Sequence, residues 1–167
     1  INRNINVNIN GKNSNVLINI SSISLNENNY DVSIHHNNKN CTSNTNIHGL
    51  TIDNNSIYIK NNGYIPNGSE KSVLHQDNKI IVMNDNKSKI EPNLFIDEYD
   101  VEASHGAYIG KFDEEELFYL NSRGLDENKC YELLIDGFLL NEFNITDDVK
   151  DDLKKIIKKY WRWKNEL

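Results

Sequence analysis

In the first hundred residues, branched apolar residues alternate with asparagine, and this alternation limits the possible folds more than any other feature. Ile5, Val7 and Ile9 are separated by single asparagines. A spacing of two places alternate side chains on opposite faces of a β-strand. The same spacing recurs at residues 16–20, 30–34, 57–59 and 94–96. We therefore expect several short strands, each with one buried face.

Turn-forming residues separate these segments, as in Asn10-Gly11 and Pro66-Asn67-Gly68. Asparagine and glycine accept the backbone conformations that turns require. The alternative is a disordered tract, since 25 of the 30 asparagines lie in residues 1–100. Disorder would not keep apolar residues in register, so we favour order over residues 1–110, with residues 36–46 and 67–79 as loose loops. A sandwich and a solenoid both remain open, because no strict short period is present.

The remainder of the chain has helical periodicity. Asp113, Asp126 and Thr146 are suitable N-caps, and acidic residues follow each of them. We expect helices from 113 to about 120, from 126 to about 143, and from 146 onward. Cys130, Leu134 and Phe138, supported by Leu133, would form the apolar face of the second helix. The change in period and composition near residues 100–112 predicts two regions, 1–111 and 112–167.

Composition excludes several classes of function. The chain carries 18 Lys and Arg against 25 Asp and Glu, so it lacks the basic excess of a bulk nucleic-acid binder. No apolar run approaches the roughly 20 residues of a membrane span. Two cysteines cannot form a disulfide framework, and a reducing compartment is expected. His35, His36 and Cys41 match no zinc spacing. No phosphate-binding loop or nucleophile motif is present.

Two features suggest function more directly. His105 follows the strand region, and its small neighbours Ser104, Gly106 and Ala107 leave room for the ring to reach a ligand. A lone histidine is more often structural. At the C-terminus, Tyr160, Trp161 and Trp163 lie among basic residues. They either pack the last helix onto the body or form a contact surface for a partner.

Residues 92–107 and 113–125 resemble the SufB/SufD family, the scaffold subunits of the SUF iron–sulfur cluster assembly machinery. Residues 6–12 and 36–44 are similar to the same family, and the resemblance covers most of residues 5–145. Within the family the chain is more similar to the SufD type, because SufB-type chains carry Glu-His-Glu where this one has Ser104-His105-Gly106. It corresponds to the C-terminal part of a complete member.

The resemblance implies a mainly β fold, in which a right-handed parallel β-helix over residues 1–111 precedes a helical subdomain over 112–167. It implies a non-catalytic scaffold that pairs with a SufB-type subunit and binds a SufC-type ABC ATPase through the helices. His105 would handle iron or a transient iron–sulfur cluster at the SufB-type interface, and no cofactor would be bound stably by this chain alone. The implied ATPase-docking residues are Leu117, Phe118, Tyr119, Leu120, Arg123 and Phe138.

Two other functions stay open from the residues themselves: a β-solenoid enzyme that acts on polysaccharides, and an interaction module without a metal role. The asparagine and isoleucine bias is typical of AT-rich codons, which together with the resemblance suggests a plastid, such as the reduced plastid of a parasite. A bacterial cytoplasm is the alternative. An unpaired edge of a β-helix invites self-association, so we expect a homodimer or an aggregate in isolation.

Overall fold

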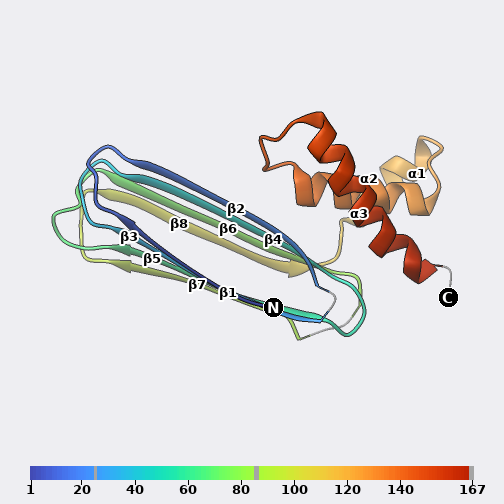
Figure 1. Cartoon of the computed structure of the whole chain (residues 1–167), viewed down its shortest axis with the longest axis horizontal. Coiled ribbons are helices and arrows are strands. Elements are labelled where there is room, and N and C mark those ends of the chain that lie inside the picture. Colours follow the sequence, from blue (N-terminus) through green and yellow to red (C-terminus); the bar gives the residue numbers. More distant parts are fainter. Residues whose placement is uncertain (25, 85–86, 166–167) are drawn as a thin grey trace. The chain divides into compact units, whose positions relative to one another are not determined.

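The computed structural model describes residues 1–24, 26–84 and 87–165, of which residues 160–165 are described by their backbone alone. The chain divides into two compact units, Ile1–Gly110 and Lys111–Leu167. The first is a stack of strands and the second is helical (Figure 1). Each unit is described by itself below.

The first unit is a parallel β-solenoid of about four turns. Each turn, or rung, gives one strand to each of two sheets, in the orders β1-β3-β5-β7 and β2-β4-β6-β8. All pairs of neighbouring strands are parallel. The predicted parallel β-helix architecture is confirmed. The strands are β1 (Asn2–Ile9), β2 (Asn15–Ser24), β3 (Glu27–His36), β4 (Thr42–Thr51), β5 (Ser56–Ile65), β6 (Ser72–Val82), β7 (Lys89–Ile96) and β8 (Val101–Gly110).

Residues that alternate along the sequence lie on opposite faces of each sheet. Val32, Ile34, Ile57 and Ile59 point inward and are fully or almost fully buried. The residues between them point outward, and some polar side chains there bond to the equivalent residue of the neighbouring rung, as Asn46 does to Asn19 at 2.9 Å and Asn93 to Asn62 at 3.0 Å. Such ladders are a common device for stabilising stacked strands. The strands predicted around residues 5–9, 16–20, 30–34, 57–59 and 94–96 are all present.

The loose loops predicted at residues 36–46 and 67–79 are wrong for most of their length, because β4 and β6 cover much of both ranges. Their inward positions hold polar residues, among them Ser43, Thr45, Gln76 and Asn78, so no apolar alternation marks them. The absence of a strict period also has a physical cause. Successive rungs of the first sheet differ in length, since Asn2 pairs with Asn29 but Tyr58 pairs with Lys89.

The second unit contains α1 (Glu114–Ser122), α2 (Glu127–Leu140) and α3 (Asp147–Asn165). The predicted N-caps of the first two helices are confirmed: Asp113 accepts a hydrogen bond from the Glu115 N–H at 2.8 Å, and Asp126 accepts one from the Lys129 N–H at 2.9 Å. None of the helices in the described part of the chain is long and apolar enough to cross a membrane.

The predicted second helix and its apolar face need correction. α2 ends at Leu140 rather than near residue 143. Its buried side chains are Cys130, Ile135, Leu139 and Leu140, whereas Leu133 is exposed. Leu134 and Phe138 are half-buried, and Phe138 meets the ring of Phe112 edge-on at 6.1 Å. The prediction concerning the side chains of Tyr160, Trp161 and Trp163 lies outside the described residues.

Candidate functional site: the terminal rung of the solenoid

The last rung of the solenoid consists of β7 and β8, each at the end of its sheet. Among the described residues, no strand pairs with the outer edge of either one. A strand edge of this kind presents unpaired N–H and C=O groups that can accept another strand. The terminal rung can therefore accept a strand of a further chain.

His105 lies on the inward side of this rung. The parallel register places it beside Gln76, which points into the interior and is buried, and Gln76 lies beside Thr45 in the rung before. His105 is nevertheless exposed. An inward-facing side chain at the end of a stack is exposed when no further rung covers it. The ring is thus presented at the open end of the solenoid interior.

The interior next to His105 is polar and uncharged. The Gln76 side-chain amide donates to the Asn61 carbonyl at 3.3 Å, and the Asn61 amide donates to Asn78 Oδ1 at 2.9 Å. Asn78 in turn donates to the Gly106 carbonyl at 3.0 Å, next to His105 in the chain. These bonds connect the last strand to the preceding rung. They fix the backbone around His105, and the His105 ring takes part in none of them.

The hydrogen-bonding direction of the β7 backbone follows from one bond. Along a strand, successive residues direct their N–H and C=O groups to opposite sides. The Asp97 N–H bonds to the Ile65 carbonyl in the rung before. Ile90, Pro92, Leu94 and Ile96 therefore direct their backbone groups to the open edge. Pro92 has no N–H, so the donors of this edge are interrupted at its middle.

The same reasoning applies to β8. The Val73 N–H bonds to the Cys41 carbonyl, so odd-numbered residues of β6 face the previous rung and even-numbered ones face β8. In β8, the residues Val101, Ala103, His105, Ala107 and Ile109 consequently direct their backbone groups to the open edge. This edge has an uninterrupted row of donors and acceptors, and His105 is at its centre.

The open end also exposes apolar side chains, because the inward-facing residues of the last rung lack the cover of a further rung. Ile109 is 44% exposed. Ile90, Leu94 and Ile96 are only half-buried, whereas their partners in β5 are fully or almost fully buried. Exposed apolar surface beside an open strand edge is typical of a protein–protein interface.

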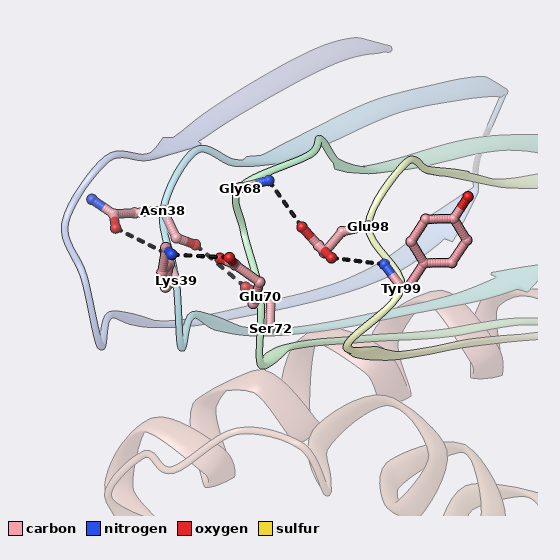
Figure 2. A network of polar contacts seen from close by, with 7 residues as sticks. All are labelled: Asn38, Lys39, Gly68, Glu70, Ser72, Glu98 and Tyr99. Atoms are coloured by element: carbon pink, nitrogen blue, oxygen red, sulfur yellow. Dashed lines mark hydrogen bonds and ion pairs between the residues drawn. The ribbon is translucent and has the colours of Figure 1, made fainter.

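The turn between β7 and β8 is held to the turn of the preceding rung (Figure 2). The Glu98 carboxylate accepts hydrogen bonds from the N–H groups of Gly68 at 2.9 Å and Tyr99 at 2.8 Å. These backbone bonds lower the pKa of Glu98. Lys39 and Glu70 form an ion pair at 2.9 Å one rung earlier. The fixed turn presents Tyr99, whose side chain is 98% exposed, at the corner of the open end.

No group of three or more His, Cys, Asp or Glu side chains suited to a metal ion occurs among the residues that the structure describes. His35, His36 and Cys41 separate in space: His35 stacks on Tyr64, His36 bonds to Ser43 at 2.7 Å, and Cys41 is buried. His75 lies one rung before β8, where it contacts Ser104 at 2.7 Å on the outer face. None of these three imidazoles belongs to a group of metal ligands with His105 in the described part of the chain.

The residues expected to dock an ATPase lie on the helical unit. Phe118 and Tyr119 are 75% and 56% exposed, and α1 buries none of its residues. The Arg123 guanidinium lies 5.1 Å from the centre of the Tyr119 ring. Leu117, Leu120 and Phe138 are half-buried. The exposed part of this set is therefore an aromatic pair with one arginine.

The chain is therefore a parallel β-solenoid with an open terminal rung, followed by a helical unit. The sequence model of the SufBD core domain of SUF-system iron–sulfur cluster assembly matches residues 1–138. The chain belongs to this family, as the resemblance predicted. Proteins of this family are generally non-catalytic scaffold components.

Individual relatives agree with this assignment. The chain is 34% identical to the iron–sulfur cluster assembly protein SufD of Bacillus subtilis over 116 residues, which is 67% of this chain and 26% of the relative. It is 36% identical to SufD of Escherichia coli over 62 residues, 37% of this chain and 14% of that protein. It is 35% identical to the chloroplastic protein ABCI7 of Arabidopsis thaliana over 74 residues, 41% of this chain and 16% of the relative. The matches to SufD lie in the C-terminal region of the relatives, and the chain spans about a quarter or less of their length.

Proposed function

We propose that the chain is the C-terminal part of a SufD-type, non-catalytic scaffold subunit. It pairs through its open terminal rung with a SufB-type subunit and binds a SufC-type ABC ATPase through its helices. The observation that carries the proposal is the position of His105 in a SufBD-family solenoid. It is inward-facing and uncovered, and its backbone is at the centre of an unpaired strand edge.

His105 would bind iron or a nascent iron–sulfur cluster as cargo. A neutral imidazole is a suitable ligand for iron, and its affinity rises as the ring loses its proton. One imidazole does not hold a cluster, since clusters are bound mainly by cysteine thiolates. Both cysteines of this chain are buried, Cys41 in the solenoid and Cys130 in α2. The remaining ligands would come from the SufB-type subunit across the open end.

The ATPase would contact the exposed aromatic pair Phe118 and Tyr119, together with Arg123. Aromatic and arginine side chains dominate the binding energy of many interfaces. Nucleotide hydrolysis in the ATPase would shift the helices and, through them, the SufB-type interface. A plastid is the proposed compartment, and a bacterial cytoplasm the alternative. The relatives include both bacterial and chloroplastic proteins.

The test is co-purification of the full-length protein with a SufB-type and a SufC-type subunit, followed by size-exclusion chromatography. A stable complex of all three is the expected result. Folded protein that elutes alone would refute the scaffold role. The remaining alternative, an interaction module without a metal role, predicts that the complex assembles and that the His105→Ala variant still supports cluster assembly.

A further inference from the structure

On the outer face of the first sheet, three planar side chains form a stack that runs from rung to rung. The ring of His35 lies 4.2 Å from that of Tyr64, and the ring of Tyr64 lies 4.7 Å from that of Phe95. The rings are inclined by only 4° and 10°. The three residues hold equivalent positions of β3, β5 and β7. Phe95 ends the stack, and its side chain is 48% exposed.

A second column lies two residues earlier on the same face and consists of amide and hydroxyl groups. The Asn62 amide donates to Ser33 Oγ at 3.1 Å, and the Asn93 amide donates to Asn62 Oδ1 at 3.0 Å. Both amides donate toward the preceding rung. Because both amides donate in this direction, the oxygen of the last one points to no further rung. Asn93 Oδ1 accepts no hydrogen bond from the described residues.

Both columns end on the half of β7 that can accept a strand. Leu94 and Ile96 direct their N–H groups to the open edge on either side of Phe95, whereas Pro92 has no N–H to offer. The part of β7 from Asn93 to Ile96 therefore combines an unpaired backbone with two unfinished side-chain columns. A strand added there would meet both columns at once.

We propose that this half of β7 receives a strand of the partner solenoid that carries an amide side chain opposite Asn93 and a planar ring opposite Phe95, two positions apart. The inference rests on the proposed pairing with a SufB-type subunit and adds the chemistry of the strand that is recognised. The partner amide donates to Asn93 Oδ1, and the partner ring stacks on Phe95. Each column then continues into the partner by one rung.

A second copy of this chain does not meet both requirements. In two-fold antiparallel pairing of β7 with itself, a register that joins the two Phe95 rings sets Asn93 against Asp97. A register that joins the two Asn93 residues sets Phe95 against Glu91. Strand β8 of a second copy has no amide among its outward residues, which are Glu102, Ser104, Gly106 and Tyr108. Self-association can cover the apolar end, but it does not continue the columns.

The first experiment measures binding of the full-length chain to the purified SufB-type subunit by isothermal titration calorimetry. Phe95→Tyr keeps a planar ring and should bind like the wild type. Phe95→Leu keeps apolar volume without the ring, and Asn93→Leu removes the acceptor. Each should weaken binding roughly 3- to 10-fold. Leu17→Ala, at an exposed apolar residue of β2, is the control and should change nothing.

The second experiment does not depend on the stability of these variants. Photoreactive p-benzoylphenylalanine replaces Phe95, the complex with the SufB-type subunit is irradiated, and mass spectrometry identifies the crosslinked segment. We expect a segment with a planar residue and an amide two positions away. A crosslink to any other segment or to a second copy, or no crosslink in an intact complex, would overturn the inference. Wild-type affinity of both Phe95→Leu and Asn93→Leu would do the same.

The two proposals can fail separately. If the wild-type chain does not bind the SufB-type subunit at all, the proposed function is wrong. If it binds, and the variants and the crosslink give the contrary results just described, the pairing stands and only the recognition by the two columns is wrong.

Discussion

His105 lies directly beside Gln76 in the parallel ladder between β6 and β8, and the two side chains point into the same interior. Gln76 is buried by the last rung, whereas no rung formed by the described residues lies beyond His105. A residue on the core side of a strand is in this way accessible from outside the solenoid.

The first prediction concerns the side chain of His105. His105→Ala should lower iron–sulfur cluster formation on the SUF complex by at least about tenfold, as loss of a metal ligand or its support commonly does. The complex itself should elute unchanged, because the substitution leaves the β8 backbone intact. Absorbance of the reconstituted cluster measures the effect. His75→Ala, on the outer face of β6, is the matched control, and an equal loss in both variants would argue against a specific role of His105.

The second prediction concerns the backbone of the open edge. Ala107→Pro removes an N–H that points away from β6, so the solenoid should keep its cooperative unfolding transition. Binding of the SufB-type subunit should weaken by roughly tenfold or more, since a hydrogen bond is lost and the proline ring obstructs an incoming strand. Calorimetry with the purified subunit gives the affinity. Undiminished binding would mean that the β8 edge does not take part in the pairing.

The third prediction is a pH dependence caused by His36. This imidazole is fully buried inside the solenoid, and burial lowers its pKa below the ordinary value of 6.5. The folded state therefore binds fewer protons than the unfolded state between the two pKa values, and stability is lost as pH falls below about 6.5. Urea unfolding at pH 7.5, 6.5 and 5.5 should show this loss, and His36→Gln should reduce the slope. An unchanged slope would exclude His36 as its source.

The fourth prediction concerns Asp136 in the helical unit. Its Oδ1 atom is buried without a hydrogen bond, and burial raises the pKa of this carboxyl group. Because the carboxyl group holds its proton more tightly in the folded state, the free energy of unfolding falls as pH rises above the ordinary pKa of 3.8. Ionised Asp136 therefore destabilises the unit at neutral pH. Asp136→Asn should give a small gain at pH 7, below about 1 kcal/mol, in chemical denaturation. A loss would show that the carboxylate has a stabilising partner.

Glu132 provides the control for that experiment. It lies one turn earlier in α2 and accepts ion pairs from Lys158 at 3.0 Å and Lys129 at 3.3 Å. Although burial opposes its ionisation, these lysines hold the pKa of Glu132 below its usual value. Glu132→Gln should therefore destabilise the unit at pH 7, in the direction opposite to Asp136→Asn.

Local sequence signals were sufficient where the interior is apolar and where helices are capped by side chains. The alternation around Val32 and Ile34 predicted a strand, and Asp113 and Asp126 predicted two helix starts. They failed for β4 and β6, because Thr45 and Gln76 occupy the interior positions there. An interior that is closed by amide and hydroxyl hydrogen bonds has no apolar period to detect.

For the candidate site, too, the sequence predicted some features and not others. His105 was selected as a candidate from its neighbours and from the family resemblance. Its inward orientation could not be predicted, since that depends on the register with Gln76, and the register depends on rung lengths that vary along the chain. The stack of His35, Tyr64 and Phe95 was missed for the same reason. Three planar residues about 30 positions apart become neighbours only once the rungs are aligned.

The central claim, that the open terminal rung pairs with a partner through the edge of β8 among others, is tested most directly by hydrogen exchange of the β8 backbone amides. The amides of Ala103, His105 and Ala107 should exchange rapidly in the free chain and become strongly protected when the SufB-type subunit binds. Those of Ser104 and Gly106, already bonded to β6, should change less. Rapid exchange of the first three amides in a complex that is shown to be intact would contradict the account.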